Sequence, residues 1–286
     1  CKRNCKYCGL RKNNKYIKRY RMSPWEIIES AGRAAELGCP TIVLQSGEDE
    51  YYSAEILADV IREIKKENDV AITLSVGERP RQDYELFKKA GADRYLLKHE
   101  TSDPQLFNSL RPGTSLAQRL EKQRWLKDLD YQLGSGNMVG LPGQTIETIA
   151  DDILLFSKMG VEMVGIGPFI PSGGTPLSGC KGGTLDMTMK VVAATRLAMP
   201  FAHLPATTAA ASLETQGRKK VLQAGANVIM PNMTPIQYRV NYTIYPGKIG
   251  LNSTPEESYN MALRDIESAG RRVGVGYGHT YQHSKK

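Results

Sequence analysis

Short apolar runs alternate with longer stretches of helical periodicity along most of the chain. Seven of these runs are 6 to 9 residues long, and most of them begin with apolar residues and end in polar or small ones. Apolar runs of this length, bounded by turn residues, are typical of buried parallel strands. The predicted strands are 41–48, 70–77, 94–100, 132–140, 163–171, 204–209 and 226–232.

The stretches between these runs carry clear helix-end signals. Ser23 and Glu26 form a predicted capping box around Pro24 at the first helical position, and residues 254–257 repeat this arrangement. Glycine is expected to end four of the helices, at Gly38, Gly91, Gly160 and Gly225. The chain therefore reads as a series of strand–helix units.

Alternating strands and helices predict a parallel sheet with right-handed crossovers. We predict an α/β fold, a (β/α)8 TIM-type barrel, as a single domain over residues 1–286. Residues 1–22 would form a cysteine-containing loop and a basic stretch, 23–250 the repeats, and 251–286 a C-terminal helix and tail. A barrel of this type has eight strands. The first one is expected in an N-terminal segment before Cys1, because a loop that carries reactive cysteines should follow a strand. The sequence also does not begin with Met.

Polar groups recur where the predicted strands end. In a barrel of this kind the reactive groups gather at the C-terminal ends of the strands. Taken singly, each polar group is an ordinary loop start, but the repetition predicts a site at this end of the barrel. The strand-end residues are Gln45, Ser46, Gly47, Glu48, Thr73, Ser75, Lys98, His99, Glu100, Asn137, Met138, Thr207, Thr208 and Met230.

Three of the five cysteines lie within one short segment. Cys1, Cys5 and Cys8 have the spacing C-x3-C-x2-C, whereas Cys39 and Cys180 are isolated. Three thiolates on one loop can hold three irons of a 4Fe-4S cluster and leave the fourth iron open to a ligand. A structural zinc site is the alternative, but it usually needs a second ligand pair, which the spacing does not show. An odd number of cysteines argues against a disulfide framework.

Composition and charge narrow the classes of function. The chain is 41% hydrophobic and 24% charged, and no apolar run reaches the ~18 residues of a membrane span. Free cysteines and the absence of secretory features indicate a reducing cytoplasm. The net charge is +8, and residues 11–21 hold six Lys or Arg residues. This basic run is either a solvated loop that attracts an anionic substrate or a nucleic-acid surface, with its tyrosines interleaved between cations.

The segment CKRNCKYCG resembles the cluster motif of the radical S-adenosylmethionine (SAM) superfamily. The resemblance implies a 4Fe-4S cluster held by Cys1, Cys5 and Cys8, whose open iron is chelated by SAM. One electron from the cluster then cleaves SAM to a 5′-deoxyadenosyl radical. The three cysteines would therefore be both metal ligands and catalytic residues.

The same resemblance implies a set of contacts with SAM. Gly47 and Glu48 are similar to the family's short Gly/Glu motif, which meets the amino group of SAM. Arg119 suits the carboxylate, although a surface position on a helix is an equal alternative. The segment 138–144 resembles the strand that lies beside the adenine. The expected cofactor-binding residues are Tyr7, Gly47, Glu48, Ser75, Glu100, Arg119 and Met138.

Eight ordered stretches between residues 1 and 250 are similar to the HydE family of FeFe-hydrogenase maturases. They are YCGLRKNNK, IVLQSGEDEYY, GADRYLLKHET, MVGLPGQT, MVGIGPFIP, LPATTA, GANVIMPNMTP and YPGKIG. The resemblance implies a role in hydrogenase active-site maturation, on an anionic, cysteine-ligated iron carbonyl cyanide precursor of the di-iron subcluster. Other hydrogenase maturation proteins and an electron donor such as ferredoxin or flavodoxin would be its partners.

An anionic substrate suits a cavity with cationic, hydroxyl and soft apolar groups. Lys98 would balance its charge, although many members of the family have an arginine there. Met163 and Met230 would form soft walls, or would be ordinary core methionines. The expected substrate contacts are Gln45, Ser46, Thr73, Lys98, Met163, Thr207, Thr208, Met230 and Tyr245.

Three alternatives remain open at this point. Two are related radical SAM enzymes that share the barrel, biotin synthase and 3-methylornithine synthase. Sulfur insertion of the biotin synthase type would need further cluster ligands in the barrel, and no cysteine lies at the strand ends. A non-enzymatic barrel that binds nucleic acid through residues 11–21 is the third.

No cysteine follows Cys180, so ligands for an accessory cluster are absent from this sequence. Residues 273–286 are expected to form a basic, flexible tail with solvated histidines.

Overall fold

Five parallel strands form the main sheet. The structure is a computed structural model that describes residues 1–281. The strands are ordered β1-β2-β3-β4-β6, and Val43 pairs with Thr73, which pairs with Arg94. Their bounds are β1 Thr41–Gln45, β2 Ala71–Ser75, β3 Arg94–Leu96, β4 Gln132–Ser135 and β6 Met163–Val164.

The sheet continues through shorter pairings. β5 (Met138–Val139) and β7 (Gly167–Pro168) pair in parallel beyond the ends of β4 and β6. Isolated bridges join Met163 to His203 and Pro205 to Val228. Seven strand positions thus follow one another in chain order, with β1 at one edge and Val228 at the other.

The α/β, TIM-type arrangement predicted from the sequence is confirmed. The predicted strands were too long, and the sixth and seventh are reduced to isolated bridges. Pro205 explains part of this reduction, because proline has no N–H to donate to a strand ladder. The eighth strand, expected before Cys1, stays a prediction.

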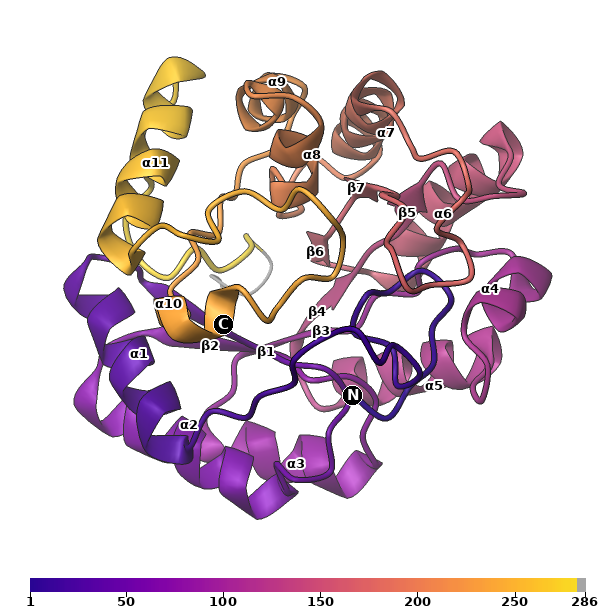
Figure 1. Cartoon of the computed structure of the whole chain (residues 1–286). Helices are drawn as coiled ribbons and strands as arrows, with labels where there is room; N and C mark the ends of the chain where they lie inside the picture. Colours follow the sequence, from indigo (N-terminus) through magenta and orange to yellow (C-terminus); the bar gives the residue numbers. More distant parts are fainter. Residues whose placement is uncertain (282–286) are drawn as a thin grey trace.

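Helices surround the strands on the outside (Figure 1). Neighbouring helices contact one another around the sheet in the pairs α1–α2, α2–α3, α3–α5, α6–α7, α7–α9 and α9–α11. None of the helices in residues 1–281 has the length and apolar character needed to cross a membrane. The bounds are α1 Pro24–Glu36, α2 Ala54–Glu67, α3 Arg81–Ala90, α4 Pro104–Leu110, α5 Leu116–Asp128, α6 Ile146–Met159, α7 Leu185–Ala198, α8 Thr208–Leu213, α9 Gly217–Gln223, α10 Ile236–Arg239 and α11 Pro255–Ser268.

The predicted helix ends are confirmed where local chemistry sets them. The Ser23 side chain accepts from the Glu26 N–H while the Glu26 carboxylate accepts from the Ser23 N–H, and Thr254 starts α11 with the same capping box. Gly91 and Gly160 end α3 and α6 in the left-handed conformation. These signals act within one turn, so the sequence alone locates them.

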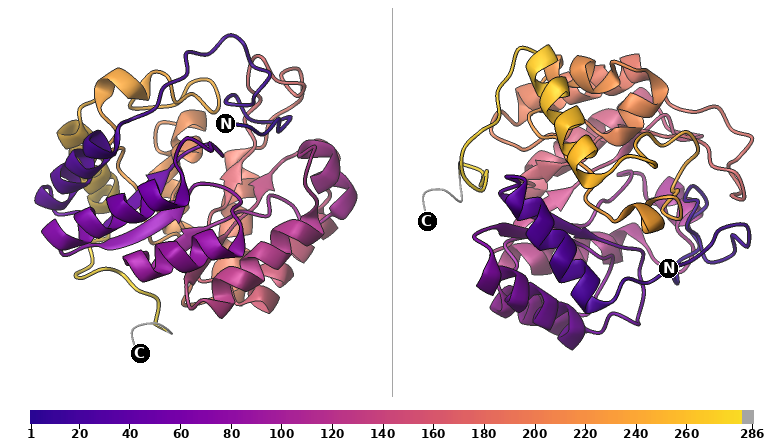
Figure 2. Two further views of the ribbon diagram at one scale, coloured as in Figure 1. Left: turned by 90° about the horizontal axis from the view of Figure 1, so that it is seen from below. Right: turned by 60° about the vertical axis from the view of Figure 1, so that its left-hand side comes forward.

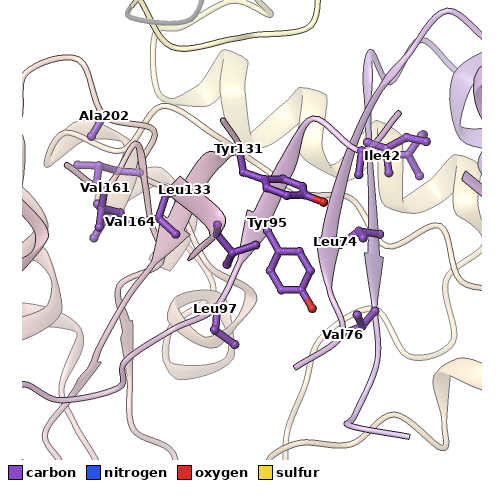
Figure 3. Close-up of a cluster of buried hydrophobic side chains, with 14 of the residues drawn as sticks. Ile42, Leu74, Val76, Tyr95, Leu97, Tyr131, Leu133, Val161, Val164 and Ala202 are labelled. Carbon is purple, nitrogen blue, oxygen red and sulfur yellow. The ribbon is translucent and has the colours of Figure 1, made fainter. Parts of the chain in front are cut away.

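The main core lies between the sheet and the helices (Figure 3). Ile42, Leu74, Tyr95, Leu133 and Val164 come from successive strands and are all buried in it. Burying a large apolar side chain contributes about 1.5–3 kcal/mol. This core makes the sheet a rigid platform, and the loops at the C-terminal ends of the strands are carried on it.

The segment 273–281 lies under the other end of the sheet, where the strands begin (Figure 2). His279 Nδ1 is 3.0 Å from Arg94 Nη2 and 2.8 Å from Gln132 Nε2. Thr280 is buried, and its N–H donates to Gln132 Oε1 at 3.3 Å. Arg94 and Gln132 are themselves buried at the starts of β3 and β4, and buried polar groups need partners.

The prediction of a solvated tail is therefore wrong for its first histidine. His279 is half-buried and hydrogen-bonded at the strand starts. No local signal marks these contacts, because Gln132 and Arg94 lie 147 and 185 residues away in the chain. His283 lies outside the described residues.

Candidate active site

The cysteine loop (residues 1–9) lies across the barrel mouth, the end of the sheet at which the strands finish. Its backbone is tied to three distant segments: Lys2 N–H donates to Glu48 O at 2.7 Å, Lys6 N–H to Leu110 O at 2.9 Å, and Gly9 N–H to Ile244 O at 2.9 Å. One of these segments follows β1 and another ends α4. The loop is therefore held by tertiary contacts before any ligand binds.

The three cysteines of the loop are free thiols in a confined setting. Cys5 is buried, and Cys1 and Cys8 are half-buried. A Cβ atom at Gly47 would lie 2.6 Å from Cys1 Cβ, so glycine is required where the β1 loop meets Cys1. Burial raises the pKa of the Cys8 thiol to about 11.

The arrangement differs from that of a single-metal site. Within residues 1–281, no group of three or more His, Cys, Asp or Glu side chains converges as one metal ion would require. The closed four-ligand set of a structural zinc site is thus not formed among these residues. Each cysteine of a cubic cluster binds a different iron, so the three thiols surround the cube and do not meet on one ion.

A chain of alternating charges runs beside the cysteine loop. Arg3 pairs with Glu48, and its Nη2 is 2.9 Å from Glu78 Oε2. Arg119 Nη2 lies 2.8 Å from the other Glu78 oxygen, and Arg111 Nη2 lies 3.4 Å from Glu48 Oε1. Glu48, Glu78, Arg111 and Arg119 are each less than a tenth exposed. Three arginines therefore share two buried carboxylates.

A second group extends this network toward the β3 end. Tyr7 OH donates to Glu100 Oε1 at 3.3 Å and accepts from Arg111 Nη1 at 2.7 Å. Lys98 Nζ is 3.6 Å from Glu100 Oε2. Burial alone would raise the pKa of Glu100, but the charges of Lys98, Arg111 and Arg119 outweigh it, so this pKa is lowered.

The two groups together hold four cations and three carboxylates, so they leave one positive charge in excess. A 4Fe-4S cluster bound by three thiolates is an anion, and nearby cations stabilise an anion in a low-dielectric setting. The thiols, the close approach at Gly47 and this excess charge fit such a cluster. The residues present therefore suit the group that the cysteine spacing implies.

Two buried donors in this network are unused. Arg111 Nε and Arg119 Nε donate to no acceptor among the described residues. A buried donor without an acceptor costs about 1–3 kcal/mol. A carboxylate ligand that accepted from these groups would remove that cost, and arginine suits carboxylates particularly well.

A small apolar cluster lies next to the charges. Tyr7 and Met138 pack with Leu110, Leu141 and Phe169, and this cluster is separate from the main core. It joins the cysteine loop to the end of α4 and to β5. It gives the site an apolar wall, of the kind on which a flat ring can lie.

Several predicted substrate residues meet at the start of α8. Thr207 caps the helix by accepting from Ala210 N–H at 3.4 Å. The Thr208 hydroxyl accepts from Arg218 Nη2 at 3.2 Å, and Tyr245 hydrogen-bonds to the Ser212 side chain. The two threonines therefore adjoin at the start of α8, and Tyr245 reaches the other end of this short helix through Ser212.

Other predicted residues follow β1 and β2. The Gln45 side chain hydrogen-bonds to Tyr242, Ser46 Oγ donates to Gly47 O at 2.8 Å, and Ser46 N–H donates to Ser75 O at 3.2 Å. These groups belong to the same end of the sheet as the cysteine loop.

The remaining predicted residues differ in exposure. Thr73 is buried within β2, and Lys98 lies against the backbone at Gly136. Met163 packs at Gly134, as an ordinary core methionine would. Met230 is 42% exposed, so the alternative of a barrel-core methionine is wrong for this residue.

Arg119 is buried, so the alternative of a surface position on its helix is also wrong. Arg3, Glu78 and Arg111 were not predicted as part of the site. Glu78 comes directly after the second predicted strand, so a longer strand-end window would have included it. Arg3 and Arg111 lie in a loop and at a helix end, where no local signal marks them.

The basic stretch contributes to the fold. Arg19 donates to the carbonyl oxygens of Leu10, Arg11 and Lys12 at 3.2, 2.8 and 3.2 Å. Arg21 binds Asp49 through two nitrogens at 2.8 and 3.0 Å. Part of this charge therefore shapes the segment, which leaves fewer cations for a nucleic-acid surface.

Comparison with known proteins decides the family. The profile described as the radical SAM superfamily matches residues 1–156. The chain belongs to the radical SAM superfamily. It is therefore an enzyme of the class that cleaves SAM by radical chemistry, and the family implies an iron–sulfur cluster and SAM as cofactors.

Individual radical SAM relatives support this assignment. The chain is 51% identical to the [FeFe] hydrogenase maturase subunit HydE of Thermotoga maritima, over 97% of this chain and 80% of that one. It is 30% identical to the 3-methylornithine synthase of Methanosarcina acetivorans, over 85% and 69% of the two chains. The crystal structure of methylornithine synthase (PylB) superposes with a TM-score of 0.82 at 26% identity, covering 96% and 80%. The predicted resemblance to HydE is confirmed.

Proposed function

We propose that this radical SAM enzyme acts in maturation of the FeFe-hydrogenase active site. The observation that carries the proposal is the 51% identity to HydE over 97% of the chain. In detail, we propose that the adenosyl radical acts on a cysteine-ligated iron carbonyl cyanide precursor of the di-iron subcluster. The enzyme would work in the cytoplasm with other hydrogenase maturation proteins.

Cys1, Cys5 and Cys8 would hold the 4Fe-4S cluster. When bound, the cluster supplies one electron that cleaves SAM and yields a 5′-deoxyadenosyl radical. The cysteine loop is already fixed by its bonds to the segments after β1 and α4, so little ordering would accompany loading. The surrounding excess of positive charge would favour the anionic, loaded state. The electron would come from a donor such as ferredoxin or flavodoxin.

The residues of this chain would bind SAM by charge and shape. Glu48 would accept from the ammonium group, and the unused Nε donors of Arg111 and Arg119 would bind the carboxylate. Ser75 and Glu100 would meet the ribose hydroxyls. Tyr7, Gly47 and Met138 would line the rest of the site, with Met138 beside the adenine.

An anionic substrate would enter from the barrel mouth. Lys98 would balance its charge, because Glu100, its ion-pair partner within residues 1–281, is shared with other cations. The hydroxyls of Thr207, Thr208 and Tyr245 gather at α8 and would donate to cyanide or carboxylate groups. Gln45, Ser46, Thr73, Met163 and Met230 would complete the lining of the cavity.

Replacing single cysteines tests the cofactor. The variants Cys1→Ala, Cys5→Ala and Cys8→Ala should each bind much less iron and sulfide after anaerobic reconstitution and should lose reductive SAM cleavage. Cys39→Ala and Cys180→Ala are matched controls, since both cysteines lie outside the loop, and they should load and cleave as the unmodified protein does. Full cleavage by any loop variant would exclude the three-cysteine cluster.

The substrate requires a separate experiment. Reduced, SAM-loaded enzyme should give a new iron-centred electron paramagnetic resonance signal only after addition of a synthetic cysteine-bound iron carbonyl cyanide complex. The 30% identity to 3-methylornithine synthase makes that reaction the second candidate. Formation of 3-methylornithine, with no response to the iron complex, would support the second candidate and exclude the first.

A further inference from the structure

One buried carboxylate joins the two strand-end segments that carry Glu100 and Met138. Asp152 lies in the middle of α6 and is fully buried. It accepts from Ser102 N–H at 2.5 Å and from Asn137 Nδ2 at 2.7 Å. The first bond fixes the turn after Glu100, and the second fixes the residue before Met138.

His99 approaches the same carboxylate from the β3 side. Its Nε2 is 3.4 Å from Asp152 Oδ1, and its Nδ1 is 3.0 Å from Ser135 Oγ. Ser135 Oγ also accepts from Gln123 Nε2 at 2.9 Å. The His99 ring lies against Phe156, with ring centres 4.8 Å apart. His99 therefore contacts α6 twice, once through Asp152 and once through Phe156.

Solvent is excluded from these polar groups. His99, Gln123, Ser135, Asn137 and Asp152 are each at most 1% exposed. Each of the five residues makes at least one hydrogen bond in this network, and breaking such a bond leaves its buried partner without water to replace it. His99 Nε2, Gln123 Oε1 and Asn137 Oδ1 make no hydrogen bond within residues 1–281, so the contact between His99 Nε2 and Asp152 is one of charge and packing. The network thus holds its two strand-end segments in one arrangement.

Glu100 needs such support, because its backbone is strained. Its φ is +67°, one of only two positive values among the non-glycine residues that the structure describes. A non-glycine residue in this region is strained and persists only where its surroundings over-determine it. Residues 99 and 102, on either side of it, are the ones that contact Asp152.

The backbone also couples Glu100 to Met138 directly. Glu100 N–H donates to Gly136 O at 2.9 Å, and Met138 N–H donates to Glu100 O at 3.0 Å. The Glu100 side chain then reaches Tyr7 of the cysteine loop. A shift of the network would therefore move two proposed SAM contacts together.

We propose that Asp152 and His99 are positioning residues for SAM binding. They touch neither the cysteines nor the mouth, and they act by holding Glu100 and Met138 in the geometry that the cofactor meets. This inference rests on the proposed function for the SAM site, and it adds residues behind that site to which the sequence comparison assigns no role.

The test is the substitution Asp152→Asn in the full chain. The new amide would turn its NH2 group toward either the Ser102 N–H or the Asn137 side-chain NH2, both of which are donors, so at least one of these two hydrogen bonds would be lost. We expect the Kd for SAM, measured by anaerobic calorimetry on cluster-loaded protein, to rise roughly tenfold or more, as for other residues that orient a ligating group. Iron content should stay unchanged. The SAM-induced shift of the reduced-cluster resonance should weaken.

Asp151→Asn is the matched control. Asp151 precedes Asp152 on α6, is exposed, and loses the same charge in the same substitution. It should bind SAM with the affinity of the unmodified protein. A second variant, His99→Gln, keeps a polar side chain beside Ser135 and should also raise the Kd for SAM. It serves as the test if Asp152→Asn does not fold.

Three outcomes would count against the inference. Unchanged SAM affinity in the folded variants would overturn it while leaving the proposed function intact. Loss of iron in parallel with SAM affinity would show a general structural role, which also overturns it. If the loaded, unmodified protein shows no response to SAM, the proposed function fails and the positioning role fails with it.

Discussion

Gly77 lies where the chain leaves β2 and passes directly under Glu48. Its φ is +84°, and a Cβ atom there would lie 2.0 Å from Glu48 Cγ. Two separate physical effects therefore require glycine: the left-handed backbone and the space taken by the carboxylate side chain. The position belongs to the site even though it carries no functional group.

We predict that Gly77→Ala destabilises the protein and weakens SAM binding. The strained backbone should cost about 1–2 kcal/mol. The clash should add about 1–3 kcal/mol and should displace Glu48 from its arginine partners. The measurement is the free energy of unfolding by denaturant, with the Kd for SAM determined on the loaded protein.

Gly270→Ala separates the two effects. Gly270, just after α11, has a left-handed φ of +72°, but nothing lies within 4 Å of an added Cβ atom. This control should show only the backbone cost and should bind SAM normally. Equal destabilisation by the two substitutions would contradict the role assigned to the Glu48 contact.

Lys248 gives the stability a specific pH dependence. Burial lowers its pKa from 10.5 to about 8, and the nearby charge of Arg239 adds to the effect. Between pH 8 and 10.5 the unfolded chain therefore binds more protons at this residue than the folded one, so stability at this group rises with pH. Below pH 8 Lys248 is protonated in both the folded and the unfolded chain, so the folded state carries the full cost of burying its positive charge.

Lys248→Met should therefore be more stable than the unmodified protein at pH 7. The difference in unfolding free energy should shrink as the pH rises from 8 to 10.5, because only the unmodified protein gains stability as its Lys248 loses the proton. Denaturant unfolding across this range gives the difference, and the exposed Lys89→Met serves as control. A difference that is constant with pH would exclude the buried charge as its cause.

At the scale of elements, the segment between Val228 and α11 depends on one side chain. Arg239 is fully buried, and its guanidinium donates to five acceptors around it. These are Asn232 O, Thr234 O, Gly250 O, Ser253 O and Ser258 Oγ. The segment contacts the cysteine loop through Ile244, so Arg239 supports the barrel mouth from behind.

Arg239→Met should loosen this segment before it unfolds the sheet. Several buried carbonyl groups would lose their donor, at a cost of about 1–3 kcal/mol for each one that stays buried. We expect faster trypsin cleavage after Lys248, the trypsin site that the variant keeps within residues 232–253, and a lower midpoint of thermal unfolding. Arg264→Met, at an exposed position on α11, should change neither.

The sequence predicted elements better than it predicted contacts between them. Helix ends set by capping boxes and glycines were found because those interactions are local. The strands were overextended, since apolar character continues past the point where pairing stops. The partnership of Arg3 with Glu78 had no local signal, because it depends on how a loop and a strand end meet in three dimensions.

The same limit applied to the site. The cysteine spacing, Glu48 and Glu100 were recognisable, since each stands at a strand end or in a motif. Arg111 was not, because its role follows only from the closeness of α4 to Tyr7. His99 stood among the predicted strand-end residues, but its contact with Asp152 had no local signal, because Asp152 lies in the middle of α6.

At the scale of the whole molecule, charge is unevenly placed with respect to the mouth. Lys12, Lys15 and Lys18 are exposed beside the cysteine loop, and no ion pair of theirs is found within residues 1–281. Tyr16, between them, is 91% exposed. Such a patch would raise the rate of encounter with an acidic electron carrier.

Reversing these three charges should slow reduction by ferredoxin or flavodoxin. We expect the variant Lys12→Glu, Lys15→Glu, Lys18→Glu to be reduced at least tenfold more slowly at low salt, an effect of the order that electrostatic steering produces. Reduction by dithionite should be unaffected. Anaerobic stopped-flow absorbance of the loaded protein measures both rates.

The control makes the same change in charge at the opposite end. Lys66, Lys89 and Lys158 are exposed in the last turns of α2, α3 and α6, which lead into the strand starts. Reversing them should leave the reduction rate near that of the unmodified protein. Equal slowing by both triple variants would indicate net charge, rather than a patch beside the loop.

Residues 273–281 lie under the strand starts, on the side away from Cys1 (Figure 2). A linker attached after them would leave the molecule on the face opposite the mouth. Protein tethered to an electrode or a bead through this end would therefore present its cysteine loop to the solution. Immobilised samples could then exchange reductant, SAM and substrate by simple buffer flow.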